Sequence, residues 1–261
     1  MNIYDCFMYH DEDLVLDIRL NTLNDFVKNF VIVESKFDHQ GNKKKLNFNL
    51  DNFKKFKDKI IYKIIENFPM NQTNWERENF QRNFILKGLT SALDEDYIII
   101  SDVDEIPNLK SLRNFQDYKY TVFEQKMFYY KINLLNKTYP IWYGSKMCKK
   151  KYLKSPQWLR NQKVKKYSFW KFYRINWNFV QNGGWHFSFL MTPENIQKKI
   201  QSFAHSEFNT NNFTNLDKIS TSIEKGIDIF DREIDYQKID FDKTFPNYIL
   251  DNKNKFRNWI L

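Results

Sequence analysis

The stretch Tyr97-Ile98-Ile99-Ile100-Ser101-Asp102-Val103-Asp104-Glu105-Ile106-Pro107 joins a run of β-branched residues to a cluster of acids. Such a run is typical of a buried parallel strand, and in open α/β sheets ligands bind beyond the carboxyl ends of the strands. Side chains two residues apart in a strand point the same way, so Asp102 and Asp104 are expected to face one ligand, with Pro107 ending the strand.

Two carboxylates on one side of a strand suit a hard divalent cation, Mn²⁺ or Mg²⁺, that carries phosphate groups. The alternative for the bare Asp-x-Asp triplet is a helix cap or a solvated turn, and the triplet alone does not decide between them.

The residues before this stretch predict alternating strands and helices. Strands are expected at 2–9, 30–34 and 60–65, and helices at 14–23, 52–59 and 75–89. This alternation predicts right-handed βαβ units and an α/β, Rossmann-like fold with a mostly parallel central sheet. The acids at 11–13 fit the amino terminus of the first helix, where they complement its dipole.

After Pro107 the pattern changes to a mixed α+β half. Strands are expected at 121–124 and 127–130, then a tight turn at 183–184 into another strand, and a helix capped by Thr192. We therefore expect one domain over 1–232, with halves at 1–107 and 108–232. A basic, aromatic tail at 233–261 would pack on this domain or flank it.

Composition is consistent with a folded, basic protein. The 261 residues are 42% hydrophobic and 18% aromatic, and the net charge is +9, which favours partners that carry phosphates or other anions. Basic patches occur at 149–151 and 163–166, and an aromatic, basic stretch at 168–179. The two cysteines give no disulfide framework, which suggests a reducing compartment, and no window reaches the length of a membrane span.

Four further residues are candidates for the site. Glu34 ends the second expected strand, and Arg77 and Arg82 can make forked bonds to phosphate. Glu78 lies four residues before Arg82, so an ion pair within the helix is an equal alternative for Arg82. His186 is either a Mn²⁺ or Zn²⁺ ligand or a packed core histidine.

Six motifs, taken in order, resemble glycosyltransferase family 17: residues 4–7 (YDCF), 31–34 (VIVE), 75–83 (WERENFQRN), 101–107 (SDVDEIP), 184–188 (GWHFS) and 202–205 (SFAH). The resemblance covers roughly residues 3–232. It implies a GT-A fold, a UDP-sugar donor, UDP-GlcNAc in the first instance, a divalent metal (Mn²⁺ or Mg²⁺) and inversion at the anomeric carbon. The acceptor would be a glycan or glycolipid in surface-glycan biosynthesis.

The resemblance also implies roles for individual residues. The metal would be held by Asp102, Asp104 and His186, the donor by Phe7, Glu34, Arg77, Arg82 and Asp102, and the acceptor by Gly184 and Trp185. Inversion needs a general base near the acceptor hydroxyl, for which Glu124 and Glu207 are the candidates. Because the chain begins directly at the first expected strand, we expect a cytoplasmic microbial or viral enzyme whose basic patches allow peripheral contact with the inner membrane face.

Two other functions remain open from the residues alone. One is a basic protein that binds nucleic acid or an anionic membrane, which leaves the acids at the strand end unexplained. The other is a metal-dependent phosphoesterase, which would need more clustered ligands than four scattered histidines supply. For the transferase we expect no nucleic-acid partner.

Overall fold

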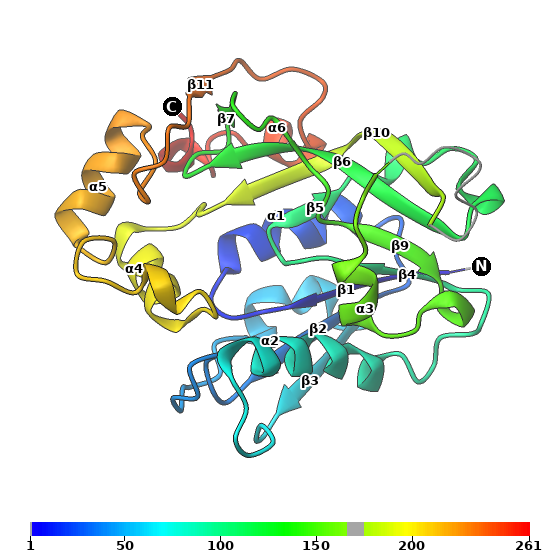
Figure 1. The fold of residues 1–261 in the computed structure, drawn as a ribbon. Coiled ribbons are helices and arrows are strands. Elements are labelled where there is room, and N and C mark those ends of the chain that lie inside the picture. Colours follow the sequence, from blue (N-terminus) through cyan, green and yellow to red (C-terminus); the bar gives the residue numbers. More distant parts are fainter. Residues whose placement is uncertain (1, 166–174) are drawn as a thin grey trace.

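The computed structural model describes residues 2–165 and 175–261, and within them one 11-stranded sheet crosses the molecule (Figure 1). The order of its main path is β11-β7-β6-β9-β4-β1-β2-β3, while β10 pairs with β5 and β6, and β8 with β6. The strands are β1 (Ile3–Met8), β2 (Asn29–Ser35), β3 (Ile60–Ile65), β4 (Tyr97–Ile100), β5 (Glu105–Pro107), β6 (Tyr120–Tyr129), β7 (Leu134–Asn136), β8 (Ile141–Trp142), β9 (Lys146–Lys149), β10 (Trp177–Ser188) and β11 (Tyr236–Lys238).

The amino-terminal part of the sheet, β3-β2-β1-β4, is parallel throughout, which confirms the predicted α/β class. Its inner strands β1 and β2, and β4, are largely buried on both faces, whereas β3 is partly exposed. Phe7 and Ile99 pack with the helix α1 (Asp13–Leu23), whereas Cys6 and Ile98 pack on the opposite face with residues that follow the helix α2 (Asn74–Asn83). This two-sided burial explains why the strands read as continuous apolar runs rather than alternating ones.

Two of the predicted helices differ from the structure in length or type. The segment predicted at 52–59 is a 3₁₀ helix, η1 (Leu50–Phe56), and α2 passes into a second one, η2 (Phe84–Gly88). The start of α2 is a capping box, in which the Thr73 hydroxyl accepts from the amide of Glu76 and the Glu76 carboxylate accepts from that of Thr73.

The acidic stretch is not one strand, so the prediction that Pro107 ends it was wrong. β4 stops at Ile100, the chain turns so that the amide of Glu105 donates to the carbonyl of Asp102 at 3.1 Å, and β5 then pairs antiparallel with β10. Asp102 and Asp104 therefore lie on a turn between two strands, and their positions depend on that turn rather than on strand alternation.

The prediction of a tight turn at Gly183 and Gly184 was also wrong, because both lie inside β10 where its register against β6 shifts. Gly184 has φ +137°, and a Cβ there would lie 2.1 Å from the carbonyl oxygen of Ile106. The close approach of β5 explains why glycine is required. The two strands predicted at 121–124 and 127–130 are one strand, β6.

The tail belongs to the same body as the rest of the chain. β11 pairs with β7, and Phe245, Ile249 and Phe256 are buried in the main core. The remaining α-helices are α3 (Pro156–Asn161), α4 (Pro193–Ser202), α5 (Leu216–Lys225) and α6 (Asn247–Asp251), and Thr192 caps α4 as predicted. Residues 166–174 of the basic and aromatic stretches lie outside the described residues. Among the helices described, none combines the length and apolarity that crossing a bilayer requires.

Candidate active site

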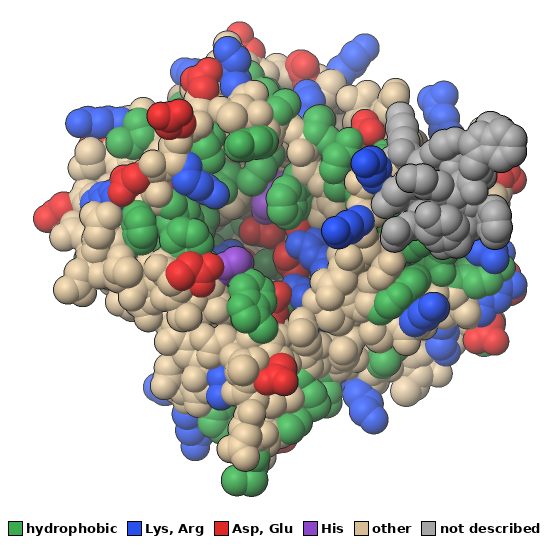
Figure 2. Space-filling model, viewed as in Figure 1, with side chains coloured by type: hydrophobic (Ala, Val, Ile, Leu, Met, Phe, Trp, Pro, Cys, Tyr) green, Lys and Arg blue, Asp and Glu red, His purple; other side chains and the backbone are tan. Residues whose placement is uncertain are grey.

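A cavity of about 1140 Å³ opens where β1, β2 and β4 end. Its lining includes His10 after β1, His39 after β2, and Asp102 and Asp104 after β4. Because β1 lies between β2 and β4, the sheet changes its winding direction here, and ligands of α/β proteins bind at such points. Figure 2 shows acidic, basic and histidine side chains together in this hollow, with apolar side chains around it.

Arg19 of α1 supports the acidic turn through hydrogen bonds, and the sequence analysis did not single this residue out. Arg19 is fully buried, and its guanidinium forms two bonds to the Asp5 carboxylate, at 2.6 and 2.7 Å. The Nη1 atom of Arg19 also donates to the carbonyls of Asp102, Val103 and Glu105, at 2.8, 3.1 and 3.0 Å. The fork of donors on one buried arginine thus defines the path of the turn.

Asp102 forms ion pairs with two arginines. Its Oδ1 accepts from Arg82 of α2 at 3.1 Å, and its Oδ2 from Arg160 of α3 at 2.7 Å. Burial opposes ionisation, but the charges of Arg160 and Arg82 outweigh it and lower the pKa of the Asp102 carboxyl below its ordinary value. Arg82 also pairs with Glu78 at 2.8 Å, as the alternative of an ion pair within the helix predicts.

Glu105 is the buried counterpart of Arg160. Its carboxylate accepts both ends of the Arg160 guanidinium, at 2.7 and 2.8 Å, and the indole Nε1 of Trp142 at 2.6 Å. A Cβ on Gly144 would lie 2.1 Å from this carboxylate, so glycine is the residue that leaves room for it. Arg160 and Glu105 therefore form one rigid unit with Asp102.

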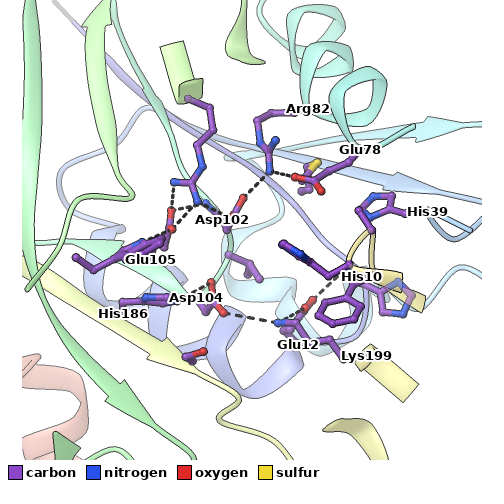
Figure 3. Close-up of a pocket in the computed structure, with 18 of the residues that line it drawn as sticks. His10, Glu12, His39, Glu78, Arg82, Asp102, Asp104, Glu105, His186 and Lys199 are labelled. Atoms are coloured by element: carbon purple, nitrogen blue, oxygen red, sulfur yellow. Dashed lines mark hydrogen bonds and ion pairs between the residues drawn. The ribbon is translucent and has the colours of Figure 1, made fainter. Parts of the chain in front are cut away.

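Asp104 faces two different cationic groups. The antiparallel pairing of β5 and β10 brings His186 alongside, with His186 Nε2 3.6 Å from Asp104 Oδ1. On the other side, Nζ of Lys199 on α4 lies 3.6 Å from Asp104 Oδ2 and 3.3 Å from the carboxylate of Glu12 (Figure 3). Both distances from Asp104 exceed those of ordinary hydrogen bonds, which leaves room between Asp104 and each cationic group.

Charge and burial act in opposite directions on these groups. Burial alone would raise the pKa of Asp104, but Lys199 and His186 outweigh it and hold that pKa well below its ordinary value. Burial alone would lower the pKa of His186, but Asp104 reverses the effect and raises it. The pair is therefore electrostatically coupled across the cavity floor.

Asp104 and His186 fit a divalent cation better than Asp102 does. The Nε2 atom of His186 and Oδ1 of Asp104 face each other at 3.6 Å, which leaves both available to a cation. The other ring nitrogen, Nδ1, is buried without a hydrogen-bond partner among the described residues, as expected where a water completes a site. Both oxygens of Asp102 are already engaged by arginines. Within the described residues no three His, Cys, Asp or Glu side chains converge as a metal site. Two protein ligands are nevertheless common for a cation that a substrate's phosphates also hold.

The structure brings together four predicted site residues, Arg82, Asp102, Asp104 and His186, in the cavity lining. His186 is also largely buried, at 8% exposure, as the alternative of a packed histidine predicts. The other predicted residues lie outside the lining; they are Phe7, Glu34, Arg77, Glu124, Gly184, Trp185 and Glu207.

Apart from Gly184, which has no side chain, each of these outlying residues has a local structural partner. Phe7 lies 4.4 Å beneath the Arg19 guanidinium, and Glu34 accepts from Lys44, Tyr62 and two backbone amides. These contacts account for their burial without a ligand. Arg77 donates to the carbonyl of His39, and Trp185 to that of Thr244.

The two predicted bases also have neighbours of their own. Glu124 lies 3.5 Å from the hydroxyl of Tyr143, and Glu207 accepts from His205 at 2.7 Å. His205 lines the cavity, whereas Glu207 does not. The sequence analysis also missed Arg160, Lys199 and Trp142. They lie in polar or aromatic segments and belong to no motif with a recognisable spacing.

The sequence is similar to known proteins over most of its length. The model of "Glycosyltransferase family 17" matches residues 1–260. The chain is 25% identical to the beta-1,4-mannosyl-glycoprotein 4-beta-N-acetylglucosaminyltransferase of Rattus norvegicus, across 95% of this chain and 52% of the rat protein. It is also 25% identical to the protein of that name from Homo sapiens, across 76% of this chain and 42% of the human protein. The chain thus spans about half the length of the curated relatives it matches.

Proposed function

The chain belongs to glycosyltransferase family 17, and on this premise we propose that it transfers N-acetylglucosamine from UDP-GlcNAc to a glycan or glycolipid hydroxyl with inversion. The relatives' names, which refer to N-acetylglucosamine and to a mannosyl glycoprotein, support this choice of sugar and of a glycan acceptor. The observation that carries the proposal is the Asp104–His186 pair, which lies at the carboxyl end of β4 beside three cationic side chains.

We assign the fold to the GT-A class, with the donor nucleotide at the carboxyl ends of β1 and β2. The parallel order β3-β2-β1-β4 and the acidic turn after β4 support this assignment. In Figure 3, His10 and His39 lie on one side of the acids, and Glu105 and His186 on the other. Burial lowers the pKa of both His10 and His39, so this end of the cavity would meet the nucleotide with neutral rings.

In our proposal Asp104 and His186 hold a divalent cation, Mn²⁺ or Mg²⁺, with the phosphates of the donor. Such a cation neutralises the negative charge that develops on a departing diphosphate. Asp102 would not be a direct ligand, because Arg82 and Arg160 occupy its oxygens. It would instead hold both arginines at the site.

The chain's own cations have a clear part in this proposal. Lys199 and Arg160 flank the acids from α4 and α3, and their pKa values are raised because carboxylates outweigh the effect of burial, so both stay charged. Fixed positive groups in a water-poor cleft stabilise developing negative charge without reorganisation. Since neither Glu124 nor Glu207 lines the cavity, the proposal gives neither of them the role of base.

A donor panel tests this function. The unfolding midpoint should rise with UDP-GlcNAc and Mn²⁺ above the rise with UDP-glucose or GDP-mannose, because only a ligand that prefers the folded state raises it. EDTA should abolish the increment due to Mn²⁺. A midpoint that no nucleotide sugar moves, but that single-stranded RNA raises in a salt-sensitive way, would favour the basic binding protein instead.

A further inference from the structure

The mouth of the cavity carries an exposed aromatic segment at residues 139–143. Its large side chains are Tyr139, Ile141, Trp142 and Tyr143, which are 63%, 42%, 37% and 37% exposed, and all four line the cavity. The segment is tied down through β8, which pairs antiparallel with β6. Large apolar side chains gathered at a cleft usually mark a binding surface.

Trp142 is the best-defined member of this segment. Its indole Nε1 donates to Glu105, which Arg160 holds by two bonds, so the ring is anchored to the same unit as Asp102. The ring centre lies 5.3 Å from that of His186, at an interplanar angle of 35°. The polar edge is thus directed into the site, while more than a third of the residue remains open to solvent.

An anchored indole with an open apolar surface suits a pyranose ring. One face of a pyranose presents C–H groups, which pack on an aromatic surface, while its hydroxyls remain free for hydrogen bonds. Glu105 holds Trp142 by its polar edge, so binding such a ring would require little ordering of the side chain.

We propose that Trp142, flanked by Tyr139 and Tyr143, is the subsite that binds a pyranose ring of the acceptor glycan. The inference rests on the proposed function and adds the place where its acceptor enters. The position of Trp142 favours the acceptor over the donor nucleotide, because Trp142 contacts Glu105 and His186, which lie opposite His10 and His39 in Figure 3. The acceptor hydroxyl would thereby approach the acids from the open mouth.

The test combines saturation-transfer NMR with steady-state kinetics. The NMR probes are methyl β-mannoside and methyl β-N-acetylglucosaminide, added with UDP present, and the kinetics use whichever glycoside accepts the sugar. In Trp142→Ala we expect the glycoside signal to fall and the acceptor KM to rise about tenfold or more. The midpoint shift given by UDP-GlcNAc should be retained.

Two control variants separate the ring from its hydrogen bond and from general effects. Trp142→Phe keeps an aromatic face but loses the bond to Glu105, so it should retain most of the glycoside signal. Phe26→Ala removes an aromatic ring that is equally exposed, at 37%, and lies outside the cavity lining, so it should behave as wild type.

Three results would overturn the proposal. The first is an unchanged acceptor KM and glycoside signal in Trp142→Ala, and the second is a loss of glycoside signal in Trp142→Phe as large as that in Trp142→Ala. The third is loss of the midpoint shift with UDP-GlcNAc in Trp142→Ala, which would assign the ring to the donor. The NMR arm needs no turnover. If nucleotide sugars did not shift the unfolding midpoint of the wild type, the proposed function would fail. The NMR signal of the glycosides would then still show whether Trp142 binds a pyranose ring.

Discussion

His186 Nε2 lies 3.6 Å from Asp104 Oδ1, and the backbone fixes this relationship through the amide of Phe187, which donates to the carbonyl of Asp104 at 2.9 Å. The two side chains therefore approach each other because β5 and β10 pair, not because they attract across a flexible gap. A cation between them would find both ligands already in position, and such preorganisation strengthens binding.

Replacing Asp104 with Asn should remove Mn²⁺ binding while preserving shape. The amide keeps the side-chain volume but loses the charge that would hold the cation, so Mn²⁺ affinity measured by calorimetry with UDP present should fall by about 100-fold or more. Asp117→Asn, which changes an exposed carboxylate outside the cavity lining, should leave affinity unchanged. Equal Mn²⁺ affinity in both variants would count against Asp104 as a ligand.

Arg19→Met should destabilise the fold strongly. It leaves the Asp5 carboxylate buried without its partner, and removing one member of a buried ion pair costs about 3–5 kcal/mol. Urea unfolding would give the free energy, with Arg113→Met, at an exposed arginine, as the matched control expected to change it by less than about 0.5 kcal/mol. Similar losses in the two variants would refute the supporting role of Arg19.

Gly144→Ala should disturb the acids through contact alone. The new methyl group would lie 2.1 Å from the Glu105 carboxylate and push it away from Arg160, at a cost of about 1–3 kcal/mol. Turnover of UDP-GlcNAc should fall in parallel. Gly226→Ala changes a glycine at φ +60° whose nearest neighbour, Leu134, is 3.5 Å away, so it should cost stability without affecting turnover. Unimpaired turnover in Gly144→Ala would contradict the tight packing around Glu105.

Lys146 should make stability depend on pH in the alkaline range. Burial, aided by the charge of Arg160, lowers its pKa from 10.5 to about 8. Between these values the unfolded chain binds more protons than the folded one, so this residue makes stability rise with pH, by roughly 3 kcal/mol over the window. Below pH 8 both states are protonated, and the full cost of burying the charge remains.

The measurement is the free energy of unfolding of wild type and of Lys146→Met at pH 8 and at pH 10.5. Other lysines and tyrosines titrate equally in both proteins, so the difference between the two free energies of unfolding reports on Lys146 alone. The free energy of unfolding of the wild type should rise relative to that of Lys146→Met as the pH rises. Parallel pH profiles would show that Lys146 titrates near its ordinary value.

The parts of the fold that local pattern determines were predictable from the sequence. The apolar run of β4 and the start of α2 are short-range signals, and both elements begin at or next to the predicted residues. Asp102 and Asp104 were identified because acids directly follow a buried run. The turn that carries them was missed, since it depends on Arg19, whose partners come from distant parts of the chain.

The rest of the site depends on long-range pairing. Arg160 lies on a six-residue helix with no unusual spacing, and only the folded chain brings it to Glu105. Glu34 is the opposite case, a residue predicted for the site that the fold uses elsewhere. Its carboxylate ends a strand, as a ligand would, but it accepts hydrogen bonds from four donors in neighbouring segments. Local sequence identifies groups that can do chemistry, but only tertiary contacts decide which of them are free to do it.

The central claim is that Asp104 and His186 hold a cation for the cleavage of a nucleotide sugar. Its most direct test is the release of UDP from UDP-GlcNAc as the sugar passes to the hydroxyl of an added acceptor glycoside or to water, measured for wild type and Asp104→Asn with Mn²⁺ and with EDTA. We expect release by wild type with Mn²⁺, and little or none with EDTA or in Asp104→Asn. Release that persists in EDTA and in the variant would contradict the account.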